Sequence, residues 1–386
     1  MITVACFSHR NLVEKELMNA FRRIPDTRVI AIEITVVTSR EQAALVCNVL
    51  KQHKCTILLT INNWGLDNEG VIADFCVKNH CILINWCVDD PFFHQIINNI
   101  DFPPSPNRLD FVSDRGYIKQ MTDQGYNAIF LPLATDPSIF HPVPEKRTFK
   151  RNTCFVGNSY REQMDKYLKK CDTYIESFLR DIPPLLRKYS ADMGYDIESE
   201  IEKLVSQREI PSHLSVRKAV FYLKHFIGYL YRKNLVVSLE GIYPDFKVFG
   251  DEGWVQDIPA EKVSRGVGYY KNLNLVYQQT RVNLDINRMV IRDGFTQRVF
   301  DSLASNSFII TSRKRVVYEY FETEGDKKEL VVFRNSEHLQ ELIDYYLRHE
   351  TERAAIAERG MKKVLSRHTY DHRVRVILKE IGKIVG

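Results

Sequence analysis

No apolar run in the sequence approaches the roughly 18 to 20 residues that are needed to span a bilayer. The first ten residues, MITVACFSHR, lack the basic and apolar segments of a secretory signal. Glycine and proline are also few, at 17 and 14 of 386 residues, which excludes a collagenous or low-complexity chain. We therefore expect a folded, cytoplasmic protein of about two domains.

Sequence motifs for metals and common nucleotides are missing as well. The eight cysteines include no Cys-x-x-Cys pair, and several lie in apolar stretches, which favours reduced, buried thiols over a disulfide framework or a zinc site. We expect neither a metal nor another cofactor. The motifs GxGxxG and GxxxxGK(S/T) are absent, which argues against an NAD-dependent dehydrogenase and a P-loop NTPase.

Acidic residues outnumber basic ones only in the first part of the chain. Residues 1–140 hold 12 Lys+Arg against 15 Asp+Glu, whereas residues 141–386 hold 42 against 34. A basic second part suits an anionic ligand there, although solvated surface lysines would produce the same bias.

Apolar runs typical of β-strands alternate with helical patterns over the first 135 residues. Strands that are apolar on both faces and separated by helices indicate βαβ units and a parallel sheet. The predicted strands are residues 3–7, 29–36, 56–61, 81–88, 110–112 and 128–133. The fold class is therefore α/β, and residues 1–140 form a Rossmann-like domain.

A second alternation of strands and helices follows a linker. Residues 141–151 carry prolines and a charge cluster without periodicity, which is typical of an interdomain segment. A second Rossmann-like domain, residues 152–368, is predicted with a helical insertion over about 160–240. Its strands are expected at residues 153–157, 246–250, 282–286, 308–311 and 330–333. The last segment, 369–386, is a helix that could pack back on the N-terminal domain.

The insertion contains an unusual segment, residues 216–237, in which five aromatic side chains lie among Lys and Arg. A core helix with basic residues along its edges is the favoured interpretation. Peripheral contact with a membrane remains an alternative, and no nucleic-acid partner is expected.

Two such domains should face each other across a cleft at the carboxyl ends of their strands. In the second domain, Gly157 and Asn158 follow a strand and precede a helix. A glycine in this turn lets the backbone approach a diphosphate, and amide donors could face it.

The segment with the richest chemistry is residues 282–312, where a strand is expected to end at Asn287 and a helix to begin near Thr296. Arginines beside a helix N-terminus suit a diphosphate, and a carboxylate one turn further on could accept hydrogen bonds from ribose hydroxyls. The candidate residues for binding a diphosphate are Arg288, Arg292, Gly294, Thr296 and Arg298, and the candidate for the ribose is Asp301. Pairing of the arginines with Asp285 or Asp293, and helix capping by Thr296, are the alternatives.

In the first domain, Asp89, Asp90 and His94 come directly after a buried strand. They are candidates for binding sugar hydroxyls or for general-base catalysis, although at least one aspartate is expected to cap the following helix. His9 and Trp64 also follow strands and could line the cleft, with packing as the alternative; if the protein transfers a group, they are the candidates for acceptor binding.

Several motifs resemble the CgeB-like glycosyltransferases, a group named for a spore-maturation protein. They are NWCVDDPFF (85–93), LPLATDPSIFHP (131–142), CFVGNSYRE (154–162), VFGDEGW (248–254), GFTQRVFDSLASNSFIIT (294–311) and the C-terminal stretch 341–373. The resemblance implies a two-domain, metal-independent glycosyltransferase B fold (GT-B). Its N-terminal domain would bind the acceptor, and its C-terminal domain would bind a nucleotide-diphospho-sugar.

The resemblance also carries over to single residues. Gly157 corresponds to the glycine of the first C-terminal strand loop, Arg298 to the arginine of the donor helix and Asp301 to the acidic residue that faces the ribose. The Asp-Asp-Pro element corresponds to Asp89 and Asp90. The chain departs from the pattern at Ser305-Asn306, where relatives commonly have a small residue and glycine; an asparagine can adopt the left-handed conformation required there.

The sequence therefore predicts a glycosyltransferase of the hexosyltransferase type. It would transfer a sugar from a nucleotide-sugar to a glycan, a lipid-linked acceptor or a protein, with retention of configuration favoured. In a retaining enzyme the arginines would stabilise the leaving diphosphate, and in an inverting one Asp89, Asp90 or His94 would act as base. A catalytically inactive binding partner in polysaccharide or spore-coat assembly and a nucleotide-sugar epimerase are the alternative functions.

Overall fold

The computed structural model of the chain describes residues 2–8, 13–33, 37–143 and 148–385. Its internal contacts divide it into two compact units. The first unit comprises Met1–Asp136, Arg292–Phe295 and Arg367–Gly386, and the second comprises Pro137–Ile291 and Thr296–Ser366. The C-terminal segment thus belongs to the first unit, and so does a short piece of the segment that we expected to bind the donor.

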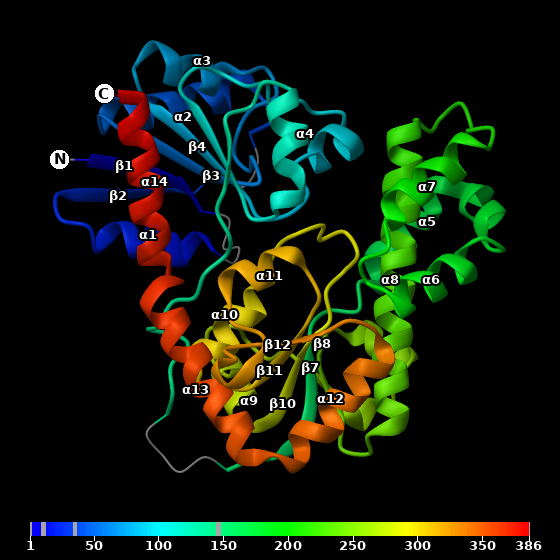
Figure 1. Cartoon of the computed structure of the whole chain (residues 1–386). Coiled ribbons are helices and arrows are strands. Elements are labelled where there is room, and N and C mark those ends of the chain that lie inside the picture. Colours follow the sequence, from blue (N-terminus) through cyan, green and yellow to red (C-terminus); the bar gives the residue numbers. More distant parts are fainter. Residues whose placement is uncertain (1, 9–12, 34–36, 144–147, 386) are drawn as a thin grey trace. The chain divides into compact units, whose positions relative to one another are not determined.

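Six parallel strands form the sheet of the first unit, in the order β2-β1-β3-β4-β5-β6 (Figure 1). The strands are β1 (Ile2–Phe7), β2 (Thr27–Ile32), β3 (Ile57–Ile61), β4 (Ile82–Cys87), β5 (Arg108–Val112) and β6 (Ala128–Phe130). The helices are α1 (Glu14–Arg22), α2 (Arg40–Gln52), α3 (Val71–Lys78), α4 (Ile118–Asp123) and α14 (Tyr370–Val385). Strands β3 and β4 are buried along their whole length, as their largely apolar sequences predict. Strand β5 is buried as well, although it contains Arg108 and Asp110.

Helix α14 packs on α1 within the first unit. The side chain of Arg373 holds it in place, because Nε donates to the carbonyl of Pro132 at 2.7 Å and Nη2 donates to that of Leu133 at 2.8 Å. On the surface, Arg23 of the segment after α1 forms an ion pair of 2.6 Å with Asp371. The last helix is therefore an integral part of a domain whose sheet lies more than 200 residues earlier in the sequence.

The second unit contains another six-stranded parallel sheet, in the order β12-β11-β10-β7-β8-β9 (Figure 1). Its strands are β7 (Arg151–Val156), β8 (Lys247–Gly250), β9 (Val263–Arg265), β10 (Thr280–Asp285), β11 (Ile309–Ser312) and β12 (Val331–Phe333). Counted from β7, this is the 3-2-1-4-5-6 strand order of the Rossmann fold. Its topological switch point lies between β7 and β10, where ligands of such sheets bind.

The helices of the second unit fall into two groups. Those that accompany the sheet are α9 (Leu273–Gln278), α10 (Gln297–Ala304), α11 (Arg315–Tyr320), α12 (Ser336–Arg348) and α13 (Glu350–Arg367). Those of the insertion are α5 (Arg161–Cys171), α6 (Ile182–Ala191), α7 (Ile197–Ser206) and α8 (Val216–Ile242). The insertion forms a helical group beside the sheet (Figure 1), with α5, α6 and α7 each in contact with the long helix α8.

Helix α8 contains the aromatic segment for which the sequence favoured a core position. Phe221, Tyr222 and Tyr231 are buried, and Tyr167 of α5 packs against the first two rings at 5.7 and 5.1 Å between centroids. None of the helices in the described part of the chain is both long and apolar enough to cross a membrane. The aromatic side chains of α8 therefore serve largely to hold the insertion together.

The sequence prediction of the α/β fold class is confirmed, with local differences. Strand β9 has only three residues and was not predicted, and the donor-segment strand ends at Asp285 rather than Asn287. The predicted extension of β2 over residues 34–36 lies outside the described residues. Asn306 adopts a φ of 54°, so the left-handed turn expected at this departure from the glycine pattern is confirmed. All eight cysteines are reduced and buried.

Candidate active site

The carboxyl ends of β7 and β10 bring two loops together at the switch point of the second sheet. The strands pair in parallel, with Phe155 opposite Leu284. The loop after β7 begins at Gly157, and the loop after β10 begins at Ile286. These are the two loops in which the sequence placed the donor-binding residues Gly157, Asn158 and Arg288.

The loop at Gly157 is built by close packing of backbone and rings. The amide of Gly157 donates to Phe249 of β8 at 2.8 Å, and its carbonyl accepts from Nε1 of Trp254 at 2.8 Å. The amide of Ser159 donates to the carboxylate of Asp251 at 2.9 Å. The expectation that backbone amides here face a diphosphate is therefore not met at Gly157 and Ser159, because strand β8 and the residue that follows it already accept from both donors.

Asp285, at the end of β10, organises the opposite loop. Its side chain is fully buried and accepts hydrogen bonds from the hydroxyls of Thr296 and Thr311, both at 2.7 Å. Arg298 completes the set with an ion pair of 2.7 Å between Nη1 and Oδ1. The carboxylate thus ties together β10, β11 and the first turn of α10.

This arrangement shows what two of the candidate residues bind within the protein. Thr296 occupies the N-cap position of α10, yet its hydroxyl binds Asp285 and makes no capping hydrogen bond to the helix. Arg298 pairs with Asp285, as the alternative interpretation held, but the pair is buried rather than on the surface: the side chain of Arg298 is 17% exposed and that of Asp285 is 0% exposed. Arg298 consequently contributes to the fold as well as to the local positive charge.

Three arginines gather around two aromatic rings at this edge of the sheet. The guanidinium of Arg298 lies 5.4 Å from the ring centroid of Phe155, and that of Arg288 lies 4.3 Å from the ring of Tyr160. The guanidinium of Arg232, from helix α8, lies 5.5 Å from the first ring and 5.6 Å from the second. The shared rings place the three cations in one cluster, which we call the arginine cluster (Arg232, Arg288 and Arg298).

Asp301 lies one turn further along α10 and is buried, with 1% of its surface exposed. Its Oδ2 accepts a hydrogen bond of 2.9 Å from the hydroxyl of Tyr269, and Gln297 donates to the same hydroxyl. The predicted contact of Asp301 with a ribose therefore requires that Tyr269 move or join in the binding.

Arg292 and Gly294 belong to the first unit, unlike the other predicted donor-site residues. The amide of Arg292 donates to Asp114 at 2.7 Å, and its guanidinium lies 4.0 Å from the ring centroid of Tyr117. A Cβ atom at Gly294 would come within 2.9 Å of the carbonyl of Ser113, so glycine permits a close approach to the end of β5. These contacts account for both residues without a ligand.

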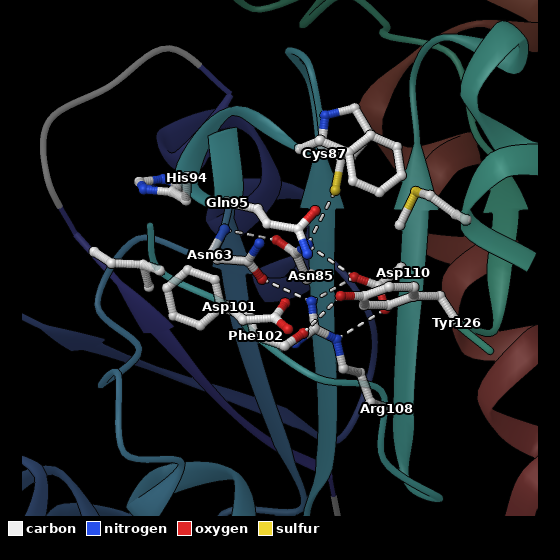
Figure 2. A pocket seen from close by; sticks show the side chains of 14 residues that line it. Asn63, Asn85, Cys87, His94, Gln95, Asp101, Phe102, Arg108, Asp110 and Tyr126 are labelled. Carbon is white, nitrogen blue, oxygen red and sulfur yellow. Dashed lines mark hydrogen bonds and ion pairs between the residues drawn. The ribbon is translucent and has the colours of Figure 1, made fainter. Parts of the chain in front are cut away.

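The first unit has a polar pocket of its own, lined by residues of β4 and β5, of the loops after β3 and β4, and of α4 and the segment after it. Figure 2 shows the side chain of Arg108 extending toward Asp110 and Asn63. Arg108 is 3% exposed and binds the fully buried Asp110 through Nε at 2.8 Å and Nη2 at 2.7 Å. Asn85 donates to the same carboxylate at 2.8 Å, so the buried charges are neutralised and their hydrogen bonds are met within the unit.

The predicted residues of the first unit occupy different positions around this pocket. His94 lines it, and the ring of Trp64 lies edge-on to His94 at 5.4 Å between centroids. Asp89 accepts a hydrogen bond of 2.9 Å from Asn62. Asp90 accepts from the amide of Phe92 at 2.9 Å and from the hydroxyl of Tyr117 at 3.1 Å. The helical turn that follows, His94–Asn98, has Phe93 at its N-cap and no capping side chain, so the expectation that an aspartate caps this helix was wrong.

His94 is the candidate base with the most altered ionisation. Burial lowers its pKa from the usual 6.5, so the ring is predominantly neutral at pH 7 and able to accept a proton. Nδ1 lies 3.2 Å from the amide nitrogen of Asn98. His9, the other histidine proposed for acceptor binding, lies outside the described residues.

Sequence reasoning missed Arg108, Asp110 and Arg232. Arg108 and Asp110 are two residues apart in a strand that is otherwise apolar, so they point to the same face of the sheet. Opposite charges at this spacing in a buried strand would have indicated an internal ion pair. Arg232 offered a weaker signal, because an arginine in an apolar helix usually extends its charge to the surface.

The fold defined by these two parallel sheets is that of the GT-B glycosyltransferases, as comparison with solved structures shows. Sucrose-phosphate synthase from Thermosynechococcus elongatus matches with a TM-score of 0.59 at 10% identity, covering 100% of this chain and 99% of its own. HepE from Anabaena, solved in complex with UDP-glucose, matches with a TM-score of 0.60 at 8% identity, covering 99% of this chain and 100% of its own.

Sequence comparison adds a family match over the second part of the chain. Residues 231–379 match a family described as glycosyl transferase-like. This range begins one residue before Arg232 and includes Asp285, Arg298 and Asp301. None of the curated proteins matches the sequence.

Proposed function

We propose that the protein is a glycosyltransferase that transfers a sugar from a nucleotide-diphospho-sugar to a hydroxyl of a glycan, a lipid-linked acceptor or a protein. The observation that carries this proposal is the arginine cluster at the switch point of a Rossmann-type sheet in a GT-B fold. Solved structures of HepE, which shares the fold, contain UDP-glucose, UDP with glucose, or UDP. The family match and the motifs that resemble those of the CgeB-like group also support a glycosyltransferase.

In this proposal the second unit binds the donor. Arg288 and Arg298 supply positive charge where the diphosphate leaves, and this needs no metal ion. Asp301, with Tyr269, would contact the ribose. Asn158 is exposed at the turn after β7 and would contact the donor from the other loop.

The first unit would bind the acceptor. Trp64 is 38% exposed and adjoins His94, so the two rings offer an apolar surface beside polar groups, as sugar acceptors require. We propose transfer with retention, in which stabilisation of the leaving diphosphate matters more than a base. In an inverting enzyme His94 would be the better base, because its ring is neutral, whereas Asp90 is engaged by Phe92 and Tyr117.

The test is binding and turnover of nucleotide-sugars by the full chain. Titration calorimetry with UDP, GDP, dTDP, CDP and ADP should identify one preferred nucleotide, and the matching nucleotide-sugar should release that diphosphate when a suitable acceptor is added. Asp301→Asn should weaken the nucleotide without affecting inorganic pyrophosphate, since only the nucleotide has a ribose. Failure of every nucleotide to bind at millimolar concentration would contradict the proposal.

Two further measurements refine the mechanism. Turnover in the presence of EDTA should equal turnover without it, and a loss of activity that magnesium restores would refute metal independence. His94→Gln should leave most of the activity if transfer proceeds with retention, whereas a loss of about a hundredfold or more would favour a general base and inversion. Conversion of the nucleotide-sugar without any acceptor would point to the epimerase alternative.

A further inference from the structure

Arg232 is an arginine that the fold buries without neutralising its charge. It lies in the middle of α8, in the helical insertion, and is 3% exposed. Its Nη2 donates to the carbonyl of Ile286 at 3.1 Å, and its Nη1 lies 3.4 Å from the carbonyl of Asn158. The guanidinium therefore spans the two loops that follow β10 and β7, at the switch point of the sheet.

Within the described residues, no carboxylate forms an ion pair with Arg232, and its Nε is buried without a hydrogen-bond partner. The acidic group in this region is Asp285, which is already bound by Arg298 and by two threonine hydroxyls. Two carbonyl oxygens satisfy part of the five N–H donors of a guanidinium and none of its formal charge. A buried cation in this condition is costly unless an anion joins it.

The surroundings of Arg232 add positive charge. Burial and the nearby Arg298 lower its pKa to about 9, so the side chain is still charged at pH 7. Burial and Arg288 likewise lower the pKa of His225, which lies seven residues earlier on the same helix, well below 6.5. Both shifts have the direction expected where cations gather without a counter-ion.

The backbone of the loop after β7 is strained where it meets the cluster. The backbone of Tyr160 has a φ of 64°, in the left-handed region that residues other than glycine, asparagine and aspartate seldom adopt. Its ring lies against Arg288 at 4.3 Å and Arg232 at 5.6 Å. Strain of this kind persists where the surrounding structure requires it, and ligand sites are a common place for it.

We infer that Arg232 is a principal cationic contact of a diphosphate group bound at the switch point, and that the helical insertion contributes to the donor site through this residue. The inference rests on the proposed function and extends it to a part of the chain outside the sheet. A planar guanidinium with an unused Nε–H can bind a diphosphate through two parallel hydrogen bonds, and the anion neutralises a charge that the protein leaves uncompensated. The same chemistry would recognise inorganic pyrophosphate or the diphosphate of a nucleotide.

The test compares Arg232→Met with the wild-type protein by titration calorimetry, using inorganic pyrophosphate and the five nucleoside diphosphates as separate probes. The variant should bind the preferred diphosphate roughly 30-fold more weakly, the scale of a lost charge-assisted hydrogen bond. Its melting temperature without ligand should equal or exceed that of the wild type, because an uncompensated buried charge has been removed. A residue that merely braces the two loops would lower the melting temperature and leave the affinity unchanged.

Lys224 provides a matched control on the same helix. It is a buried cation, 5% exposed, but it is paired with Glu198 at 2.9 Å. Lys224→Met should lower the melting temperature and leave diphosphate binding within about twofold. Equal weakening by Lys224→Met and Arg232→Met would overturn the inference, because the effect would then reflect general loss of positive charge.

The remaining outcomes separate this inference from the proposed function. If Arg232→Met fails to fold, Arg232→Gln replaces it in the test, since glutamine keeps a donor for one carbonyl but removes the charge. Wild-type affinity in Arg232→Gln overturns the inference.

If the wild type binds a nucleoside diphosphate and Arg288→Met weakens this binding while Arg232→Met does not, the inference fails and the proposed function stands. If the wild type binds none of the probes, both fail. Weaker binding of both pyrophosphate and nucleotide by Arg232→Met assigns the contact to the diphosphate rather than to the base or ribose.

Discussion

Each unit buries an arginine against its parallel sheet, but, within the part of the chain that the structure describes, one of the two arginines is paired with a carboxylate and the other is not. In the first unit, Arg108 forms a bidentate ion pair with the fully buried Asp110. In the second unit, Arg232 donates to two carbonyl oxygens, lies beside other arginines and has no carboxylate partner among the residues that the structure describes. A neutralised pair is a component of the fold, whereas an arginine without a counter-ion is best explained by an anionic ligand.

The two sheets differ in a related way. The switch point of the second sheet lies between β7 and β10, where the arginine cluster is found. The first sheet has the order 2-1-3-4-5-6, so its switch point lies between β1 and β3, and part of the loop after β1 lies outside the described residues. The polar pocket of the first unit forms around β4 and β5 instead.

The largest expected effect comes from breaking the neutral pair of the first unit. Asp110→Ala leaves the buried Arg108 without its carboxylate and should lower the free energy of unfolding by about 3 to 5 kcal/mol. Calorimetry and urea denaturation would measure the loss. The double variant Arg108→Met/Asp110→Leu should recover most of it, because both charges are then absent. Unchanged stability in Asp110→Ala would show that the Arg108–Asp110 pair does not stabilise the fold, and the contrast with Arg232 would no longer hold.

The second prediction contrasts two arginines of the same cluster. Arg298→Gln removes the cationic partner of the buried Asp285 and should lower the free energy of unfolding by about 2 to 3 kcal/mol, together with a loss of nucleotide binding. Arg232→Met should lose binding without losing stability. Thermal unfolding of the two variants side by side makes the comparison, and equal destabilisation would contradict it.

The third prediction concerns the packing of the loop after β7. A Cβ atom at Gly250 would come within 2.4 Å of the carbonyl of Gly157 and 2.9 Å of the Trp254 ring. Gly250→Ala should therefore lower the free energy of unfolding by about 1 to 3 kcal/mol. Gly241 of α8 is the control, since nothing lies within 4 Å of its Cβ position and alanine there should stabilise by about 0.5 to 1 kcal/mol. Melting temperatures that shift in the same direction would refute this account.

The smallest expected effect is on pH dependence. The pKa of His94 in the first unit is lowered by burial, and that of His225 in the second is lowered further by burial, Arg288 and Lys224. Both histidines stay neutral in the folded protein as pH falls below 6.5, while the unfolded chain takes up protons, so stability decreases from pH ~7.5 toward pH ~5. Melting temperatures across this range should depend less on pH in His225→Gln than in His94→Gln. If His94→Gln reduces the pH dependence of the melting temperature more than His225→Gln does, the expected order of the two histidines is wrong.

Much of the fold could be predicted from local sequence. Largely apolar runs such as residues 81–88 identify buried parallel strands, because both faces of such a strand are covered by helices. Strand β9 was missed since three residues carry too little periodicity. The site was predicted less completely: Arg292 and Gly294 lie in the loop predicted to bind the donor, yet their contacts are with Asp114 and Ser113. Nothing in the local pattern indicates which unit such a loop joins.

The sequence alone thus determined the class of the fold and the loops in which polar residues gather, because both depend on spacing along the chain. The tertiary structure decided which charges are neutralised. Asp285 is bound by Arg298, 13 residues away, whereas Arg232 reaches carbonyls 54 and 74 residues away in the sequence. Whether a buried arginine has a counter-ion depends on long-range contacts of this kind, and they are the basis of our inference that Arg232 binds an anion.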